Sequence, residues 1–188
     1  MVCRKDFNKL IISILALWIG EQKVDPREII RGRRVLIVDD EQDVLDALVE
    51  LLNICKIDTA STFEEGKKLL ENNIYDIAIL DIMGVDGFSL LKIAIEMGIP
   101  VLMLTAHALS AETLKKSAKN GASYYVPKEE MSKMHVFMAD VLEAKDKKKN
   151  PWIKCLERLG SFYDKKFGGT NWREKEKEFW EKRIKTIK

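Results

Sequence analysis

Two hydrophobic patterns alternate along residues 35–144. Short segments in which every position is apolar, such as Val35–Val38 and Ile77–Leu80, are separated by stretches with apolar residues three and four positions apart. The first pattern is typical of strands buried on both faces of a sheet, and the second of helices with one apolar side. The expected strands are Val35–Val38, a short one at Asp58–Ser61, Ile77–Leu80, Val101–Leu104 and Tyr124–Val126. The alternation predicts an α/β fold, a doubly wound parallel sheet with helices on both faces.

Helices are expected between these strands, over 42–55, 64–72, 88–97, 111–120 and from Ser132 to about Ala144. Ser and Thr are strong N-cap residues, which favours helix starts at Thr62, Ser110 and Ser132. Glycine ends helices readily, which fits Gly98 and Gly121. The sequence therefore predicts where the helices begin and end as clearly as it predicts the strands.

The segments that flank this region are also patterned. Apolar residues between Phe7 and Ile19 recur at helical spacing, and Pro26 and Gly32 bracket a short helix in the linker that follows. In the tail, one helical stripe holds Trp152, Leu156, Leu159, Phe162 and Tyr163, and Asn171 can cap a last helix, Trp172–Ile187. These aromatic residues must be buried somewhere. We expect an N-terminal helical extension and linker (1–32), a central domain (33–144) and a helical tail (145–188).

Composition adds a charge asymmetry to this picture. With 46% apolar and 33% charged residues, the chain is typical of globular proteins. Residues 1–34 carry 8 basic and 4 acidic side chains, the middle 9 and 19, and residues 145–188 carry 15 and 7. The basic flanks favour docking on the acidic body or on an anionic partner, with solvated helix faces as the alternative. Three widely spaced cysteines predict neither a disulfide framework nor a zinc site, and fit a reducing cytoplasmic location.

Chemically useful side chains gather where the expected strands end. Asp39 and Asp40 follow the first strand, Asp81 the third, Thr105 the fourth and Lys128 the fifth. In a parallel sheet these ends share one edge, where ligands bind. Carboxylates suit Mg²⁺, an aspartate can accept a phosphoryl group, and lysine and threonine can contact phosphoryl oxygens. The set predicts phosphoryl transfer to one aspartate with help from a metal ion.

These landmarks resemble the receiver domain of two-component response regulators. The resemblance covers residues 33–144 and rests on motifs that occur in the expected order: Val38-Asp39-Asp40-Glu41, Leu80-Asp81, Asp86-Gly87, Leu104-Thr105-Ala106 and Gly121-Ala122 with Tyr125 and Lys128. It implies a flavodoxin-like (βα)₅ fold with strand order 2-1-3-4-5. It also implies a histidine kinase or a histidine phosphotransfer protein as phosphodonor.

The resemblance assigns a role to each site residue. Asp81 would be the phosphoacceptor, with Thr105 and Lys128 contacting the phosphoryl group. Mg²⁺, or Mn²⁺ in its place, would be held by Asp39, Asp40, Asp81 and the backbone carbonyl of Met83. Tyr125 would be an aromatic switch residue that moves with Thr105, or else a core tyrosine. Glu41 is expected to cap the first helix, and His107 to lie in a surface loop.

Two departures from the family pattern affect this site. The loop Asp81-Ile82-Met83-Gly84-Val85-Asp86-Gly87 is shorter than usual and lacks the usual proline. Pro127 precedes Lys128, where the family places a proline after the lysine. The first departure concerns the loop that would supply the Met83 carbonyl to the metal.

The leading functional hypothesis is a phosphorylation-controlled signalling protein that acts through an unknown downstream protein. Its only chemistry would be self-phosphorylation from a phosphodonor and autodephosphorylation, not metabolic catalysis. The aromatic tail would cover the surface around the fourth helix, fifth strand and fifth helix and respond to phosphorylation. The N-terminal helix would pack on the body or in a homodimer, and a membrane-surface role is less favoured. The alternatives are a pseudo-receiver scaffold, a regulator whose basic tail binds DNA, which interleaved acids disfavour, and an aspartate-based phosphatase, whose second aspartate is missing.

Overall fold

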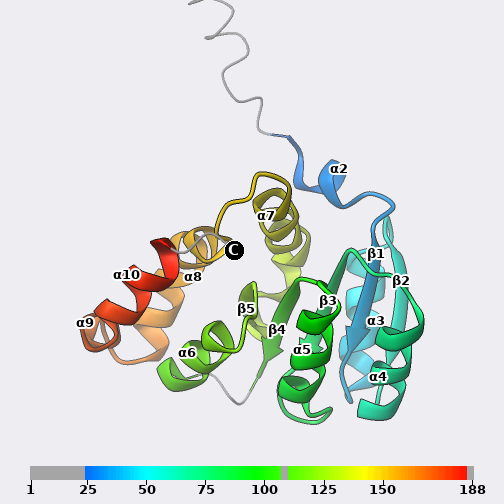
Figure 1. Cartoon of the computed structure of the whole chain (residues 1–188), viewed down its shortest axis with the longest axis horizontal. Coiled ribbons are helices and arrows are strands. Elements are labelled where there is room, and N and C mark those ends of the chain that lie inside the picture. Colours follow the sequence, from blue (N-terminus) through cyan, green and yellow to red (C-terminus); the bar gives the residue numbers. More distant parts are fainter. Residues whose placement is uncertain (1–23, 107–109, 186–188) are drawn as a thin grey trace, which may run out of the picture.

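The computed structural model describes residues 24–106 and 110–185. Its centre is a parallel five-stranded sheet in the order β2-β1-β3-β4-β5, which confirms the predicted fold class and strand order (Figure 1). The strands are β1 Arg34–Val38, β2 Lys56–Ala60, β3 Ile77–Asp81, β4 Val101–Thr105 and β5 Tyr124–Pro127. Only β2 differs much from expectation, because it begins two residues before the expected Asp58.

Burial explains why the central strands are uniformly apolar. Every residue of β3 and β4 is buried, because helices cover both faces of the sheet. The edge strand β2 is only partly buried, which accounts for its mixed sequence. The helices α3 and α7 contact each other, and α4 contacts α5 on the opposite layer (Figure 1). Their bounds are α3 Gln42–Leu51, α4 Phe63–Asn72, α5 Gly87–Glu96, α6 Ala111–Lys119 and α7 Met134–Asp146.

Side-chain capping confirms two of the expected helix starts and corrects a third. Thr62 accepts a hydrogen bond from the Glu65 N–H, and Ser110 accepts one from the Thr113 N–H. Ser132, however, does not cap a helix. It lies inside the 3₁₀ helix η1, Lys128–Lys133, and α7 begins only at Met134. The chain after β5 thus turns tightly before the α-helix starts.

The linker before β1 forms the expected short helix. In α2, Pro26–Ile30, the Asp25 side chain accepts a hydrogen bond from the Arg27 N–H. Gly32 has a φ of +71°, a conformation that glycine adopts readily, and it turns the chain into β1. Helix α2 packs on α7. The amphipathic helix expected between Phe7 and Ile19 lies outside the described residues.

Three helices follow α7 in the described residues, which end at Lys185. The first, α8, spans Trp152–Lys166, and the expected last helix is in fact two, α9 Asn171–Lys175 and α10 Lys177–Lys185. Asn171 therefore lies within a helix instead of capping one, and Thr170 holds the N-cap position. A break near Glu176 lets Trp172 and Trp180 pack edge to face, 6.2 Å apart.

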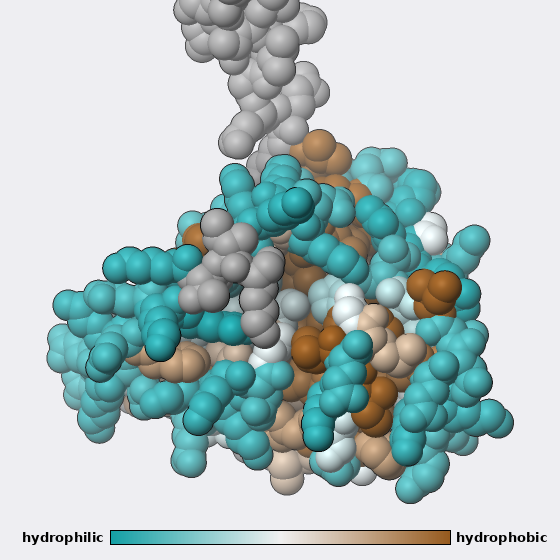
Figure 2. Space-filling view, viewed as in Figure 1, coloured by the Kyte–Doolittle hydropathy of each residue, from teal (hydrophilic) through white to brown (hydrophobic). Residues whose placement is uncertain are grey.

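The tail is buried against the sheet and not extended into solvent. Its buried aromatic residues belong to the same hydrophobic core as the strands. The three helices lie beside β5 and α6 (Figure 1), and the outward surface over them is mostly hydrophilic (Figure 2). Within the described part of the chain, no helix is long and apolar enough to cross a membrane.

Candidate functional site

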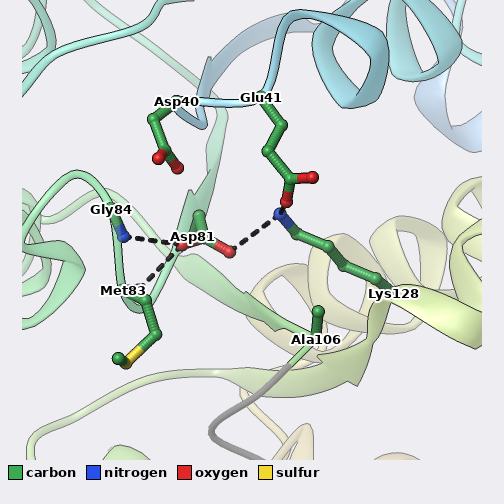
Figure 3. Close-up of a pocket in the computed structure, with 7 residues that line it drawn as sticks. All are labelled: Asp40, Glu41, Asp81, Met83, Gly84, Ala106 and Lys128. Carbon is green, nitrogen blue, oxygen red and sulfur yellow. Dashed lines mark hydrogen bonds and ion pairs between the residues drawn. The ribbon is translucent and has the colours of Figure 1, made fainter.

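The structure brings the predicted strand-end residues to one edge of the sheet. Asp39 follows β1 directly, Asp81 ends β3, Thr105 ends β4 and Lys128 follows β5. The side chains of Asp81 and Lys128 point toward each other, and Asp40 points toward Asp81 (Figure 3). The parallel register places these strand ends at a common level, as the sequence predicted.

The Lys128 ammonium is the centre of the charged network. Its Nζ lies 3.1 Å from Asp81 Oδ1, 2.7 Å from Glu41 Oε1, and 3.0 and 2.8 Å from the two oxygens of Asp39. The shorter contact with Asp39 lies outside hydrogen-bond angles, so it is ionic. Burial opposes the ammonium charge, but the hydrogen bonds to Asp39, Glu41 and Asp81 outweigh it and raise the pKa of Lys128. The lysine therefore stays charged at every physiological pH.

Asp39 is the most buried member of the network, with none of its surface exposed. Burial raises the pKa of its carboxyl group above the ordinary value, against the opposing effects of Lys128 and the Glu41 N–H. The nearby Asp81 charge adds to the increase. Burial thus disfavours the charge of Asp39, and the Lys128 ammonium stabilises it.

The loop after β3 holds one oxygen of Asp81. Oδ2 accepts hydrogen bonds from the backbone N–H groups of Met83 (2.7 Å) and Gly84 (3.3 Å), while Oδ1 faces Lys128 (Figure 3). The short loop closes through Asp86, whose φ is +48°, and through Gly87, where a Cβ would lie 1.9 Å from the Asp81 carbonyl oxygen. The left-handed backbone of Asp86 and the missing side chain of Gly87 thus allow this loop to be shorter than usual.

Asp40 depends on a second glycine of the same loop. A Cβ at Gly84 would lie 2.0 Å from the Asp40 carboxyl group. Any residue other than glycine would therefore displace this carboxylate. Asp40 and Gly84 both line the cavity of the strand-end site, which has a volume of about 290 Å³. Its lining consists of Asp40, Glu41, Asp81, Met83, Gly84, Ala106 and Lys128.

The donor set of this cavity fits a small hard cation. Within residues 24–106 and 110–185, no three His, Cys, Asp or Glu side chains form a ready-made metal cluster. Magnesium does not need one, because it keeps several waters and binds through one or two carboxylates. Asp40, Asp81 and Met83 line the cavity, and Asp39 contacts Lys128, which also lines it.

Thr105 precedes Ala106, which lines the cavity, and Tyr125 lies on the neighbouring strand β5; both residues are buried. The Tyr125 phenol group hydrogen-bonds with the Thr105 side chain and the Ser110 backbone, and burial raises the pKa of the phenol despite these bonds. Tyr125 also packs edge to face on Tyr163 of α8, with ring centroids 6.2 Å apart. The structure therefore places Tyr125 between the strand-end site and the tail.

Sequence reasoning misassigned one site residue and missed another. Glu41 stands at the N-cap position of α3, but its side chain makes no capping hydrogen bond and pairs with Lys128 instead. Gly84 was not singled out, although its missing side chain makes room for Asp40. The run Asp39-Asp40-Glu41 held the signal for Glu41, because a third acid beside two others needs a cation. His107 lies outside the described residues.

Comparisons with known proteins agree with this geometry. Residues 35–138 match the family described as response regulator receiver domain. The two-component response regulator ARR18 of Arabidopsis thaliana is 42% identical over 103 residues, which is 52% of this chain and 16% of that protein. For ARR11 of the same plant, the values are 28% over 148 residues, 75% of this chain and 27% of that protein. The chain thus matches only a small part of these relatives' length.

Solved structures give the same result. The Francisella response regulator 1452 receiver domain is 26% identical, with a TM-score of 0.55 over 61% of this chain and 99% of that one. A CheY-like receiver domain protein from Methanospirillum hungatei JF-1 is 29% identical, with a TM-score of 0.53 over 61% of this chain and 98% of that one. The fold, the strand-end residues and these matches lead to one conclusion: this chain belongs to the family of response regulator receiver domains.

Proposed function

We propose that Asp81 is the phosphoacceptor of a signalling switch whose phosphodonor is a histidine kinase or a histidine phosphotransfer protein. One observation carries the proposal. The Asp81 carboxylate lines an open cavity, with one oxygen held by two backbone N–H groups and the other 3.1 Å from a lysine ammonium. This arrangement orients a carboxylate nucleophile and places a cation where phosphoryl charge would gather.

The proposed step is a phosphoryl transfer. An Asp81 carboxylate oxygen attacks the phosphorus of a phosphohistidine, the phosphorus–nitrogen bond breaks, and the imidazole leaves with a proton from solvent. Lys128 moves from its carboxylate partners toward a phosphoryl oxygen, and the Thr105 hydroxyl donates to another. Because Lys128 already contacts Asp81, only a short movement is needed.

Asp39, Asp40, Asp81 and the Met83 carbonyl would hold Mg²⁺, or Mn²⁺ in its place. The ion would neutralise charge on the transferring phosphoryl group. The residues supply the rest: Gly84 leaves space for Asp40, and the Met83 and Gly84 N–H groups fix Asp81. The ion would also give the buried Asp39 carboxylate a second cation besides Lys128.

We further propose that the output is a protein–protein contact, in the cytoplasm, from a receiver domain over residues 33–144 flanked by two extensions. A DNA-binding tail is less well supported, because several tail cations already have intramolecular partners. Arg158 pairs with Asp140, Lys166 with Glu129 and Arg173 with Asp164. These pairs would have to break before the cations could follow a phosphate backbone.

Incubation with phosphoramidate, with and without Mg²⁺, tests the proposal by intact mass. We expect one added phosphoryl group that requires Mg²⁺ and is absent in Asp81→Asn. Asp86→Asn is the matched control, because Asp86 lies in the same loop and should leave phosphorylation intact. If the wild-type mass does not change, the chain is a pseudo-receiver scaffold and the proposed switch is wrong.

A further inference from the structure

The three carboxylates that contact the Lys128 ammonium differ in how far water can reach them. The side chains of Asp39 and Asp81 are 0% and 5% exposed, whereas that of Glu41 is 59% exposed. Figure 3 shows Glu41 reaching the ammonium from the start of α3, while Asp81 approaches it from the end of β3. Two of the partners are therefore enclosed, and the third lies at the surface.

The donors of Lys128 are fully engaged by these partners. An ammonium has three N–H groups and accepts no hydrogen bond. Its Nζ donates to Asp39 Oδ1 at 3.0 Å and to Glu41 Oε1 at 2.7 Å, and Asp81 Oδ1 lies 3.1 Å away. A phosphoryl oxygen that takes one of these donors has to displace one of the three carboxylates.

The difference in exposure decides which carboxylate is displaced most readily. A buried carboxylate that loses its cation has no water to replace it, so separating Lys128 from Asp39 is costly. Asp81 would itself carry the phosphoryl group, so an ammonium that contacts a phosphoryl oxygen stays near it. The exposed Glu41 carboxylate gains water as the ammonium leaves, and exposed ion pairs are weak. The contact with Glu41 is consequently the easiest to break.

The local backbone places Glu41 at the cavity of the strand-end site. Its N–H donates to Asp39 Oδ1 at 3.1 Å, the same oxygen that accepts a hydrogen bond from Lys128. Its side chain makes no capping hydrogen bond with α3, and it lines the cavity together with Asp81 and Lys128. The Glu41 carboxylate and a phosphoryl group on Asp81 would therefore share one cavity and one cation.

From these contacts we propose that Glu41 is a positioning residue, which holds Lys128 in the unphosphorylated protein and yields it to the phosphoryl group on Asp81. The inference rests on the proposed function, since it assumes that Asp81 is the phosphoacceptor. Glu41 pairs with Lys128 only before phosphorylation, so it stabilises the unphosphorylated state and opposes the phosphorylated one. No covalent bond changes at Glu41, because one ionic partner of the ammonium is exchanged for another.

Beryllofluoride at saturating Mg²⁺ measures this exchange at equilibrium, because it mimics a phosphoryl group on a carboxylate oxygen and binds reversibly. Glu41→Gln removes the charge of the side chain and keeps its size. We expect its dissociation constant for beryllofluoride to fall about twofold to fivefold, the range expected for loss of one exposed ion pair. Titration of the full-length protein by ¹⁹F NMR measures the constant. Such a gain in affinity cannot result from a damaged fold.

Asp43→Asn is the matched control for charge alone. Asp43 is an exposed acid in the first turn of α3, two residues beyond Glu41, so the variant removes one negative charge from the same helix end. Its dissociation constant for beryllofluoride should stay close to that of wild type. An equal gain in Asp43→Asn and Glu41→Gln would assign the effect to general repulsion of the anion and overturn the exchange. Unchanged or weaker binding by Glu41→Gln would also overturn it.

Phosphoramidate with Mg²⁺ separates failure of this inference from failure of the proposed function. Intact mass should show a larger phosphorylated fraction in Glu41→Gln than in Asp43→Asn, and none in Asp81→Asn. If wild type takes up a phosphoryl group but the first two variants reach equal fractions, the exchange is wrong and the proposed function stands. If wild type neither gains mass nor binds beryllofluoride, the proposed function fails and the inference fails with it.

Discussion

The strand-end site and the α8 interface meet the same strand, β5, but they are built in opposite ways. At the site, the single ammonium group of Lys128 pairs with the three carboxylates of Asp39, Glu41 and Asp81 beside an open cavity. At the interface, Trp152 and Tyr163 are buried, and their polar groups donate to backbone carbonyls. The first region holds more carboxylates than cations, so a bound cation can change its charge balance. The second buries its aromatic rings and gives the Trp152 and Tyr163 donors backbone acceptors.

This difference implies a difference in energetic role. Burying large aromatic side chains stabilises a fold by several kcal/mol, whereas a buried ion pair often contributes little net stability because desolvation offsets it. We therefore expect mutations at the α8 interface to change stability most. Mutations at the site should change binding and phosphorylation more than they change folding.

The largest expected effect comes from Trp152→Ala. Loss of a buried Trp leaves a cavity and should lower the free energy of unfolding by about 3–5 kcal/mol in urea unfolding. Ile153→Ala on the same helix is the control, because that side chain is 39% exposed and its loss should cost within about 0.5 kcal/mol. Similar losses for both variants would mean that α8 is not anchored through Trp152.

The next largest effect is expected from Lys128→Met, which removes the cation of the strand-end site. Without the ammonium, Asp39 and Asp81 lose their shared cation, and we expect a loss of about 2 kcal/mol, less than for a fully buried pair because the cavity is open. Added Mg²⁺ should restore part of this loss, measured by thermal unfolding with and without the ion. Lys133→Met is the control, since its pair with Glu130 is exposed. If Mg²⁺ stabilises Lys128→Met no more than it stabilises wild type, Lys128 is not the cation that balances these carboxylates.

The two regions also differ in how far the sequence could predict them. Asp39, Asp81, Thr105 and Lys128 could be placed because each ends a strand, and parallel strands end at one edge. The tail aromatics indicated only a need for burial. Their spacing and charge did not identify β5 as the partner, because a hydrophobic stripe does not specify which surface it covers. The expectation that the tail covers the fourth helix, fifth strand and fifth helix came from the resemblance to receiver domains.

Local errors have the same kind of origin. Glu41 was expected to cap α3, but a charged partner 2.7 Å away competes better than the backbone N–H groups for its carboxylate. Ser132 has good N-cap chemistry, yet the chain forms a 3₁₀ helix there before α7 begins. The expected stripe of α8 left out Cys155, which is fully buried beside the Tyr125 carbonyl, whereas Leu156 packs on the core but is only partly buried.

A smaller effect, confined to the site, is expected from Gly84→Ala. The new methyl group would collide with the Asp40 carboxylate and should weaken Mg²⁺ affinity about tenfold, equivalent to about 1.4 kcal/mol. Titration of Mg²⁺ by calorimetry measures the effect. In an Asp40→Asn background, Gly84→Ala should cost almost nothing more, because both changes act on one carboxylate. Additive losses would show that Gly84 acts elsewhere.

The smallest expected effect is on the pH dependence of stability, and it comes from a residue outside both regions. His135 lies on α7, the helix that packs on α2, and its Nδ1 is buried without a hydrogen-bond partner. Burial lowers the pKa of its imidazole, Arg27 lowers it further, and Asp25 opposes them. The unfolded chain therefore binds the proton more readily, so this contribution to stability is complete above about pH 6.5 and is lost as pH falls through the lowered folded-state pKa.

His135→Gln should therefore flatten the stability profile below neutral pH while leaving Asp81 phosphorylation unchanged. Urea unfolding of both proteins on either side of pH 6.5 measures the slope, and NMR titration of the imidazole measures the pKa directly. In Arg27→Gln the pKa should rise only part of the way to its usual value, because burial is the larger cause. Complete recovery in that variant would assign the shift to charge, and an unchanged slope in His135→Gln would show that His135 does not cause the loss of stability at low pH.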